Sequence, residues 1–296
     1  MIKRTIEISR EPAHLTVRLG QLLVRRGEET AGSVPCEDLG VVLVDHPGTT
    51  YSHAALTKLA ESEAVLVVCG TDHLPAAVLL PLSDHRQVVW RVHDQLSVGK
   101  PLRKQLWKQL VQAKIRGQAT NLASDCPARR KLLALARSVR SGDPNNVEAQ
   151  AARIYWQNWL PEIEFRRDAK GDGVNSLLNY GYAVVRAAVA RALVAAGLLP
   201  VLGLKHSNRA NAFCLADDLM EPLRPLVDDR ARELVCEGYD SLIPEAKVGL
   251  LELLADRVQT GTQTGPLMVA LHRMVASLVH CYQGESRRLE IPQPCA

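Results

Sequence analysis

Aromatic side chains are scarce in this chain. Phe, Trp and Tyr together make up 4% of the 296 residues. This argues against a protein that reads single-stranded nucleic acid by stacking its bases on many rings. Hydrophobic residues (47%) and charged residues (23%) are otherwise in the range of an ordinary globular protein.

Long apolar runs are also lacking. The longest candidate, 187–202, is interrupted by Arg191, Gly197 and Pro200, and it falls short of the ~20 residues that cross a bilayer. The first residues lead directly into a strand-like alternation, without the apolar segment of a signal peptide. We therefore expect a cytoplasmic protein with no membrane association.

Paired cysteines are absent from the sequence. The seven cysteines are odd in number and widely scattered, and none forms a C-x-x-C pair. This spacing argues against a structural zinc site and against a disulfide framework. It agrees with a cytoplasmic location, and most of these thiols are expected to be small buried apolar groups.

The charge is unevenly distributed along the chain. Residues 1–95 carry 9 Lys and Arg against 12 Asp and Glu, whereas residues 96–296 carry 27 against 20. A polyanion, if one binds, is therefore expected mainly on the second part.

The residue pattern changes near residue 95. The first part contains short alternating or β-branched runs that predict strands, at 2–9, 15–19, 22–26, 39–44, 64–69 and 76–80, with a helix over 50–63 capped by Ser52. After the breaker cluster at 97–101 the periodicity is helical, and it predicts helices over 102–122, 128–140, 147–159, 174–198, 211–232, 246–260 and 266–283. We predict an α+β multidomain chain with a β-rich domain at 1–95, an all-α domain at 96–296 and a mobile tail from about residue 284.

Three polar segments of the second part could carry chemistry. Glu148 lies in the first turn of the helix that follows the cap signal 141–146, where a carboxylate is also favoured simply by the helix dipole. His206 lies in a polar loop after an apolar run, where a solvated histidine is the simpler interpretation. The basic positions along 102–122, Lys114 among them, are expected to form a solvated face.

The third segment holds several acids among apolar neighbours. Asp218 and Glu221 are three residues apart and share one helix face, while Asp217 points elsewhere. An inward-facing carboxylate is costly unless it holds a cation or an arginine, and Arg224 could be that partner.

Taken together, the glutamate, the histidine and the acidic pair form a donor set for Mg²⁺ or Mn²⁺. The surrounding Arg153, Lys205, Arg209 and Arg224 could neutralise phosphate. This combination predicts metal-assisted phosphoryl transfer, provided that the three segments meet in space.

At these residues the sequence resembles the family of CRISPR-associated protein one, in particular its representatives in type II systems. The matching blocks occur in the same order along nearly the whole chain, at 37–42, 45–47, 71–75, 104–107, 142–148, 179–182, 203–206 and 216–222. Two small departures are Val147, where the family commonly has Arg, and Leu223, where it commonly has Phe.

The resemblance implies an N-terminal β-sandwich-like domain for dimerisation and partner contacts, followed by an all-α catalytic domain. It implies a homodimer that binds double-stranded DNA and forms a heterohexamer with the small ferredoxin-like adaptation protein. It implies Glu148, His206 and Glu221 as metal ligands, with Asp218 assisting; whether Glu221 or Asp218 is the principal third ligand stays open. The implied reaction joins prespacer 3′-hydroxyl ends to the CRISPR repeat by transesterification.

Two other functions compete with the integrase. In one, the chain is a non-catalytic DNA-binding scaffold whose acids, histidine and arginines form a structural ion-pair network. In the other, it is a general metal-dependent nuclease for branched DNA. Metal-dependent strand transfer distinguishes the scaffold from the enzymes, and dependence on a leader-repeat target distinguishes the integrase from the nuclease.

Overall fold

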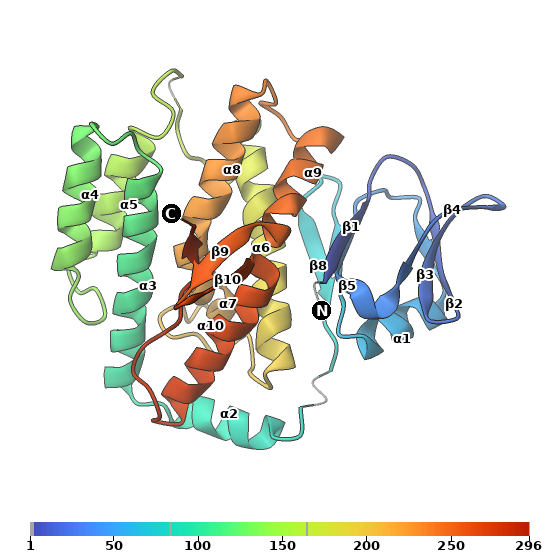
Figure 1. Ribbon diagram of the computed structural model, residues 1–296, viewed down its shortest axis with the longest axis horizontal. Helices are drawn as coiled ribbons and strands as arrows, with labels where there is room; N and C mark the ends of the chain where they lie inside the picture. The colour runs from blue at the N-terminus through green and yellow to red at the C-terminus, as the bar shows by residue number, and fades with distance from the viewer. Residues whose placement is uncertain (1–2, 83–84, 164, 296) are drawn as a thin grey trace.

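The computed structural model describes residues 3–82, 85–163 and 165–295. Strands from the N-terminal part lie together on one side of the molecule, and most of the helices lie on the other side (Figure 1). The predicted strands are confirmed to within about two residues, with residue 2 outside the described part.

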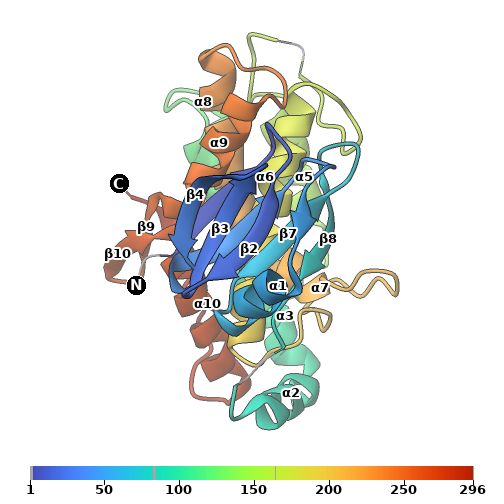
Figure 2. The same ribbon diagram turned by 90° about the vertical axis from the view of Figure 1, so that its right-hand side faces the viewer.

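Two sheets form the N-terminal part (Figure 2). The first has the order β1 (Arg4–Ile8), β5 (Leu39–Val44), β7 (Val65–Cys69) and β8 (Pro75–Leu79). The second has the order β4 (Glu29–Pro35), β3 (Gln21–Arg26), β2 (His14–Arg18) and β6 (Thr50–Tyr51). In the first sheet only β8 runs antiparallel to its neighbour.

Strand β5 is buried on both faces. Successive side chains of a strand point to opposite faces, so Val42 and Val44 join Leu15 and Leu22 of the second sheet in one hydrophobic core. On the other face, Val41 joins the core of the helical part. The first sheet is thus shared between the two parts of the chain.

The helices match the predicted segments except at residues 88–97, where no helix was predicted, and at 211–232 and 246–260, which are described below. They are α1 (His53–Glu61), α2 (Val88–Ser97), α3 (Lys100–Thr120), α4 (Pro127–Ser138), α5 (Val147–Trp156), α6 (Val174–Ala195), α7 (Cys214–Met220), α8 (Arg224–Cys236), α9 (Pro244–Glu252) and α10 (Leu267–Tyr282), with 3-10 turns at Cys36–Asp38, Glu221–Leu223 and Leu253–Ala255. Helix α2 runs through residue 95, and the domain division at that residue stays a prediction.

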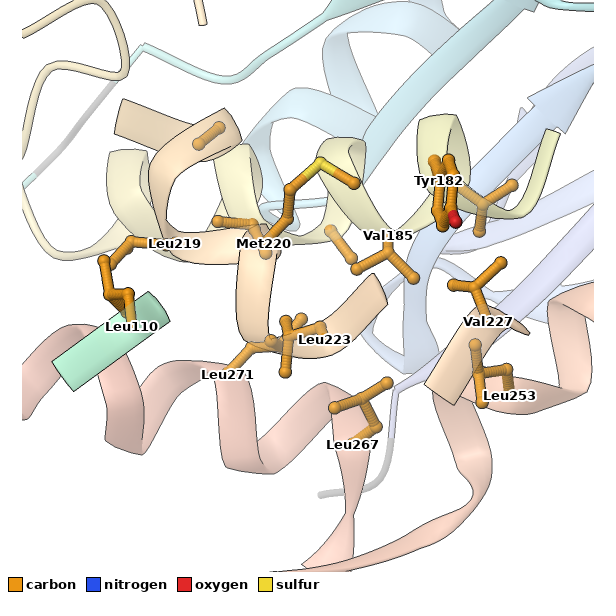
Figure 3. Packing of buried hydrophobic residues seen from close by; sticks show 14 of the residues in the cluster. Leu110, Tyr182, Val185, Leu219, Met220, Leu223, Val227, Leu253, Leu267 and Leu271 are labelled. Carbon is orange, nitrogen blue, oxygen red and sulfur yellow. The ribbon is translucent and has the colours of Figure 1, made fainter. Parts of the chain in front are cut away.

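The single helix expected over 211–232 is wrong. The structure has α7, a 3-10 turn and then α8. Pro222 and Pro225 lack the amide hydrogen that a continuous helix would use, and their rings crowd the preceding turn. Around this break Leu219, Met220 and Leu223 pack in the core (Figure 3), which fixes Glu221 between them.

The second part is not all-α, contrary to the prediction. Strands β9 (Arg257–Thr260), β10 (Gln263–Pro266) and β11 (Gln293–Pro294) form a small sheet in the order β10-β9-β11. The helix predicted over 246–260 ends at Glu252. Residues 257–260 form a strand instead, because their burial alternates with period two. Gly261, at φ +59°, then makes the turn to β10.

The tail after Gly284 is extended but is held in place rather than free. The amide of Leu289 donates to the side chain of Gln109 at 2.9 Å, and that of Glu290 donates to Ser277 Oγ at 2.9 Å. Strand β11 then pairs with β9.

Helix α6 is long and apolar enough to cross a membrane by length and composition. However, 78% of its most apolar window is buried inside the protein. It packs against α7, α8, α9 and α10 and against the first sheet, which is the environment of a core helix.

Candidate active site

A cluster of alternating charges connects three separate helical segments. Lys114 of α3 donates to Glu148 Oε1 of α5 at 2.6 Å and also to Glu221 Oε2. Arg224 Nε donates to the other oxygen of Glu221 at 2.9 Å. Two carboxylates that are 73 residues apart in the chain therefore converge on one ammonium group.

Lys114 corrects the expectation of a wholly solvated basic face on this helix. Its side chain is only 11% exposed. Trp107, Leu110 and Gln118, which lie seven and four residues before it and four after it, are buried too. Residues at this spacing share one helix face. The spacing of these buried neighbours in the sequence therefore predicts that Lys114 points inward.

Glu221 is held ionised by its two cations. Burial alone would raise the pKa of this carboxyl, but the charges of Lys114 and Arg224 outweigh that effect and lower it to about 2. The same arrangement raises the pKa of Lys114 against the opposing effect of burial, through the charges of Glu221 and Glu148.

Glu148 is positioned by the cap of α5. The carboxylate of Asp143 accepts hydrogen bonds from the amides of Val147 at 2.9 Å and Glu148 itself at 3.0 Å. Asp143 and Asn146 both have positive φ, which folds the turn back onto the helix end. The cap signal predicted at 141–146 is therefore confirmed, with Asp143 as the capping side chain.

His206 is oriented by Asp218. Its Nδ1 lies 2.6 Å from Asp218 Oδ1, and Asp218 also accepts from the amides of Leu204 at 2.6 Å, Lys205 at 2.9 Å and His206 at 3.3 Å. A Cβ on Gly203 would lie 2.3 Å from the His206 carbonyl oxygen, so the turn requires glycine. The hydrogen bond to Asp218 raises the pKa of His206 despite partial burial.

Asp218 is fully buried and its carboxylate is saturated by these bonds. It therefore has no lone pair directed at a second ligand and acts on the imidazole. Of the two acids that the sequence left open, Glu221 is the one in the charge cluster.

The predicted trio falls into two groups that contact α3 about two helical turns apart. Glu148 and Glu221 share Lys114, while His206 packs edge-on against Trp107 of the same helix, with ring centroids 5.7 Å apart. In the described part of the chain, no three His, Cys, Asp or Glu side chains are gathered closely enough to hold a metal ion. The metal site thus stays a prediction.

The four predicted phosphate contacts differ in burial, and Arg224 is the one that contacts this cluster among the described residues. Arg153, Lys205 and Arg209 are exposed, whereas Arg224 is half-buried against Glu221 and lies 4.5 Å from the ring centre of Tyr182. Sequence reasoning missed a further arginine, Arg167, which lines a cavity of about 230 Å³ beside the cluster with Lys114, Gln118, Ala152, Trp156, Tyr182, Glu221, Arg224 and Asp228.

Asp228, in this cavity, is a buried acid whose charge is costly. Burial raises the pKa of its carboxyl from 3.8 to about 7, although Tyr182 donates a hydrogen bond to it. The folded chain therefore binds a proton here that the unfolded chain has released, so this group makes stability fall as the pH rises from about 4 to about 7.

We expect Asp228→Asn to remove this pH dependence. The melting temperature of the variant relative to the wild type should rise between pH 5 and pH 8. By pH 8 the wild type should have lost on the order of 2–4 kcal/mol of unfolding free energy to the ionisation of Asp228. Thermal unfolding across this range would measure it, with Asp229→Asn as the matched control on the next, more exposed residue. A constant difference between variant and wild type would contradict the assignment.

Two comparisons with known proteins identify the family of this chain. Residues 6–239 match the family described as CRISPR associated protein Cas1. The chain belongs to the Cas1 family. It is 37% identical over 285 residues to a CRISPR-associated endonuclease Cas1 from Neisseria meningitidis serogroup C, covering 94% of this chain and 92% of that protein.

Solved structures show the same fold. A casposase bound to its integration product matches with a TM-score of 0.81 at 18% identity, covering 98% of this chain and 94% of that one. A Cas6-RT-Cas1–Cas2 complex matches with a TM-score of 0.79 at 17% identity, covering 98% of this chain and 36% of that one. The predicted resemblance is confirmed, and the curated relative of this chain is named a CRISPR-associated endonuclease.

Proposed function

We propose that this Cas1 protein is a metal-dependent DNA integrase and endonuclease of CRISPR adaptation, which joins prespacer 3′-hydroxyl ends to the CRISPR repeat by transesterification. The observation that carries the proposal is the convergence of Glu148 and Glu221 on one cation beside Arg224. Buried opposed carboxylates need a cation, and arginine at the rim suits a phosphodiester.

The donor types are ones that Mg²⁺ or Mn²⁺ binds, and holding such an ion would require Glu148, Glu221 and His206 to close together, since no three such donors are gathered in the described part of the chain. The ammonium of Lys114 marks the position of a cation between Glu148 and Glu221. His206 has its Nδ1 engaged by a carboxylate, as metal-binding histidines usually do, which leaves Nε2 as the ligand atom. These three residues would hold the metal, and Asp218 would fix the imidazole. When bound, the metal supplies Lewis acidity at the scissile phosphate.

The protein's own side chains bind and orient the DNA. Arg224 is fixed by Glu221 and the Tyr182 ring, so it can direct a fork of donors at a phosphate with little loss of entropy. Arg153, Lys205 and Arg209 are exposed and add contacts to the DNA backbone that position the duplex without reading its sequence. Binding should therefore weaken steeply with salt.

We propose that it works as a homodimer in a heterohexamer with the small ferredoxin-like partner, Cas2, on double-stranded DNA in the cytoplasm. The match to a Cas6-RT-Cas1–Cas2 complex supports Cas2 as the partner, and the match to a casposase bound to its integration product supports DNA as the substrate.

The scaffold function has one observation in its favour. Lys114 and Arg224 already neutralise Glu148 and Glu221, so the cluster could be a purely structural ion network. A measurement of strand transfer separates the two functions.

We expect His206→Ala to reduce strand transfer by about 10²-fold or more, because the variant lacks one metal ligand. A labelled short duplex would be joined to a plasmid carrying a leader and repeat, with Mn²⁺ or Mg²⁺ and the Cas2 partner present. His53→Ala, an exposed histidine at the start of α1, is the control.

Three outcomes decide between the functions. Products that need metal and the leader-repeat target, and that are lost only in His206→Ala, support the integrase. Metal-dependent cleavage of branched DNA without target preference supports the general nuclease. DNA binding without cleavage or joining by the wild type supports the scaffold.

A further inference from the structure

Arg167 lies in the segment between α5 and α6 and is held there by neutral groups. Its guanidinium donates to Asn175 Oδ1 at 3.0 Å and to Asn179 Oδ1 at 2.6 Å. Asn175 also bonds the backbone of this segment, accepting from the amide of Asp168 and donating to the carbonyl of Arg166. The two asparagines of α6 thus fix both the side chain and the segment that carries it.

The positive charge of Arg167 has no ion-pair partner within 4.0 Å in the described part of the chain. The neighbouring cations differ in this respect, because Lys114 and Arg224 both bond Glu221. Amide oxygens orient a guanidinium without neutralising it, so its charge remains available to an anion.

One aromatic ring connects Arg167 to the charge cluster. The guanidinium of Arg167 lies 5.5 Å from the centre of the Tyr182 ring, and that of Arg224 lies 4.5 Å from it. Both arginines line the same cavity of about 230 Å³ as Glu221. Two like charges held around one ring repel each other, and an anion between or beside them would relieve the repulsion.

Asp228 also lines this cavity and would oppose an anion if it were ionised. Its carboxylate is engaged by the hydroxyl of Tyr182, and burial raises its pKa to about 7. Near neutral pH, Asp228 is therefore partly protonated and carries less negative charge than an ordinary aspartate would. The positive charge of Arg167 in the cavity is not cancelled by it.

From these observations we infer that Arg167 binds a backbone phosphate of the DNA strand adjacent to the phosphate that reacts at Glu148 and Glu221. Arg167 would thereby set the register of the strand in the site. The inference rests on the proposed function, since it places the reacting phosphate at the glutamates. The ligand is a phosphodiester, which matches the planar fork of a guanidinium.

The test removes the phosphate charge and the arginine charge separately. Substrates carrying a single neutral methylphosphonate at each position around the joining site would be compared with wild type and with Arg167→Gln. We expect one position at which the neutral linkage slows wild-type strand transfer about 10- to 100-fold, as expected for a charge-assisted hydrogen bond. At that position Arg167→Gln should be equally slow with either linkage.

Two variants serve as controls. Arg166→Gln removes the same charge from the neighbouring exposed residue of the same segment and should respond to the neutral linkages as the wild type does. Arg167→Lys keeps the charge without the fork and should retain part of the sensitivity. The methylphosphonate series on wild type gives its result even if a variant does not fold.

The inference is overturned if Arg167→Gln keeps the wild-type sensitivity at every phosphate. It is also overturned if Arg167→Gln joins DNA more slowly than the wild type but loses strand-transfer rate by the same factor at every neutral linkage. A wild type that never joins or cuts DNA is a different result, and it contradicts the proposed function instead.

Discussion

Glu221→Gln should lower metal-dependent strand transfer by about 10²- to 10³-fold, the cost of removing one preorganised electrostatic group from an active site. Glutamine has nearly the same shape but no charge. Its substitution removes the anion that binds Lys114 and Arg224 and would bind the metal. Rates measured at several Mn²⁺ concentrations should show a deficit that added metal only partly restores.

The same substitution also changes the stability of the fold. It leaves Arg224 without its carboxylate partner in a half-buried position, and breaking a buried ion pair costs about 3–5 kcal/mol. Activity must therefore be measured below the melting temperature of the variant. Glu237→Gln, at the exposed end of α8, gives the matched control. Unchanged strand transfer in a folded Glu221→Gln protein would remove Glu221 from the site.

The parts of the site that the sequence could predict are those set by local chemistry. Glu148 follows a cap whose residues are adjacent in the chain, and His206 follows the turn at Gly203. Whether Glu221 or Asp218 is the third ligand stays a prediction. What distinguishes them in the structure is not local in the sequence: the backbone amides of 204–206 fold over Asp218 and occupy its carboxylate oxygens.

Long-range contacts account for what the sequence could not predict. Lys114 is 34 residues from Glu148 and 107 from Glu221. Its charge alone predicts a solvent-exposed side chain, but the buried face of α3 that carries it packs against α5 and the turn after α7. Arg167 was missed because its partners are amides of α6 rather than acids. Neither spacing nor charge pattern identifies such a pair.

The fold shows the same division between local and distant information. Strands β4 and β6 and helix α2 were not predicted. Most other strand and helix positions followed periodicity, because alternation and the 3.6-residue period reflect burial within one element. The small sheet β9–β11 did not, since it needs the distant tail at Gln293–Pro294 to complete it. The sharing of β5 between two cores is likewise decided by what packs on each face.

The charge cluster permits two interpretations that differ in what Lys114 does. In a scaffold, its ammonium is the permanent partner of Glu148 and Glu221. In an enzyme, it holds the two carboxylates together until a divalent cation takes its place between them. Both interpretations predict that Lys114 stabilises the metal-free protein, and only the second predicts that a metal can substitute for it.

Lys114→Met should therefore destabilise the metal-free protein strongly. Methionine fills similar space but leaves Glu148 without its cation and Glu221 with Arg224 alone, at a cost of about 3–5 kcal/mol. For a chain of this size that corresponds to a fall in melting temperature of roughly 5–15 °C. Lys108→Met, on the same helix and outside the ion pairs of the described residues, should change it little.

Mn²⁺ should then raise the melting temperature of Lys114→Met more than that of the wild type. A ligand that binds only the folded state adds about 2.7 kcal/mol at one hundred times its dissociation constant, and without the competing ammonium that concentration is reached sooner. Thermal unfolding over a Mn²⁺ series measures both effects. If Mn²⁺ stabilises Lys114→Met no more than Lys108→Met, no divalent cation binds between the glutamates. The cluster would then be a structural ion network, because the ammonium would be the one cation that the two carboxylates accept.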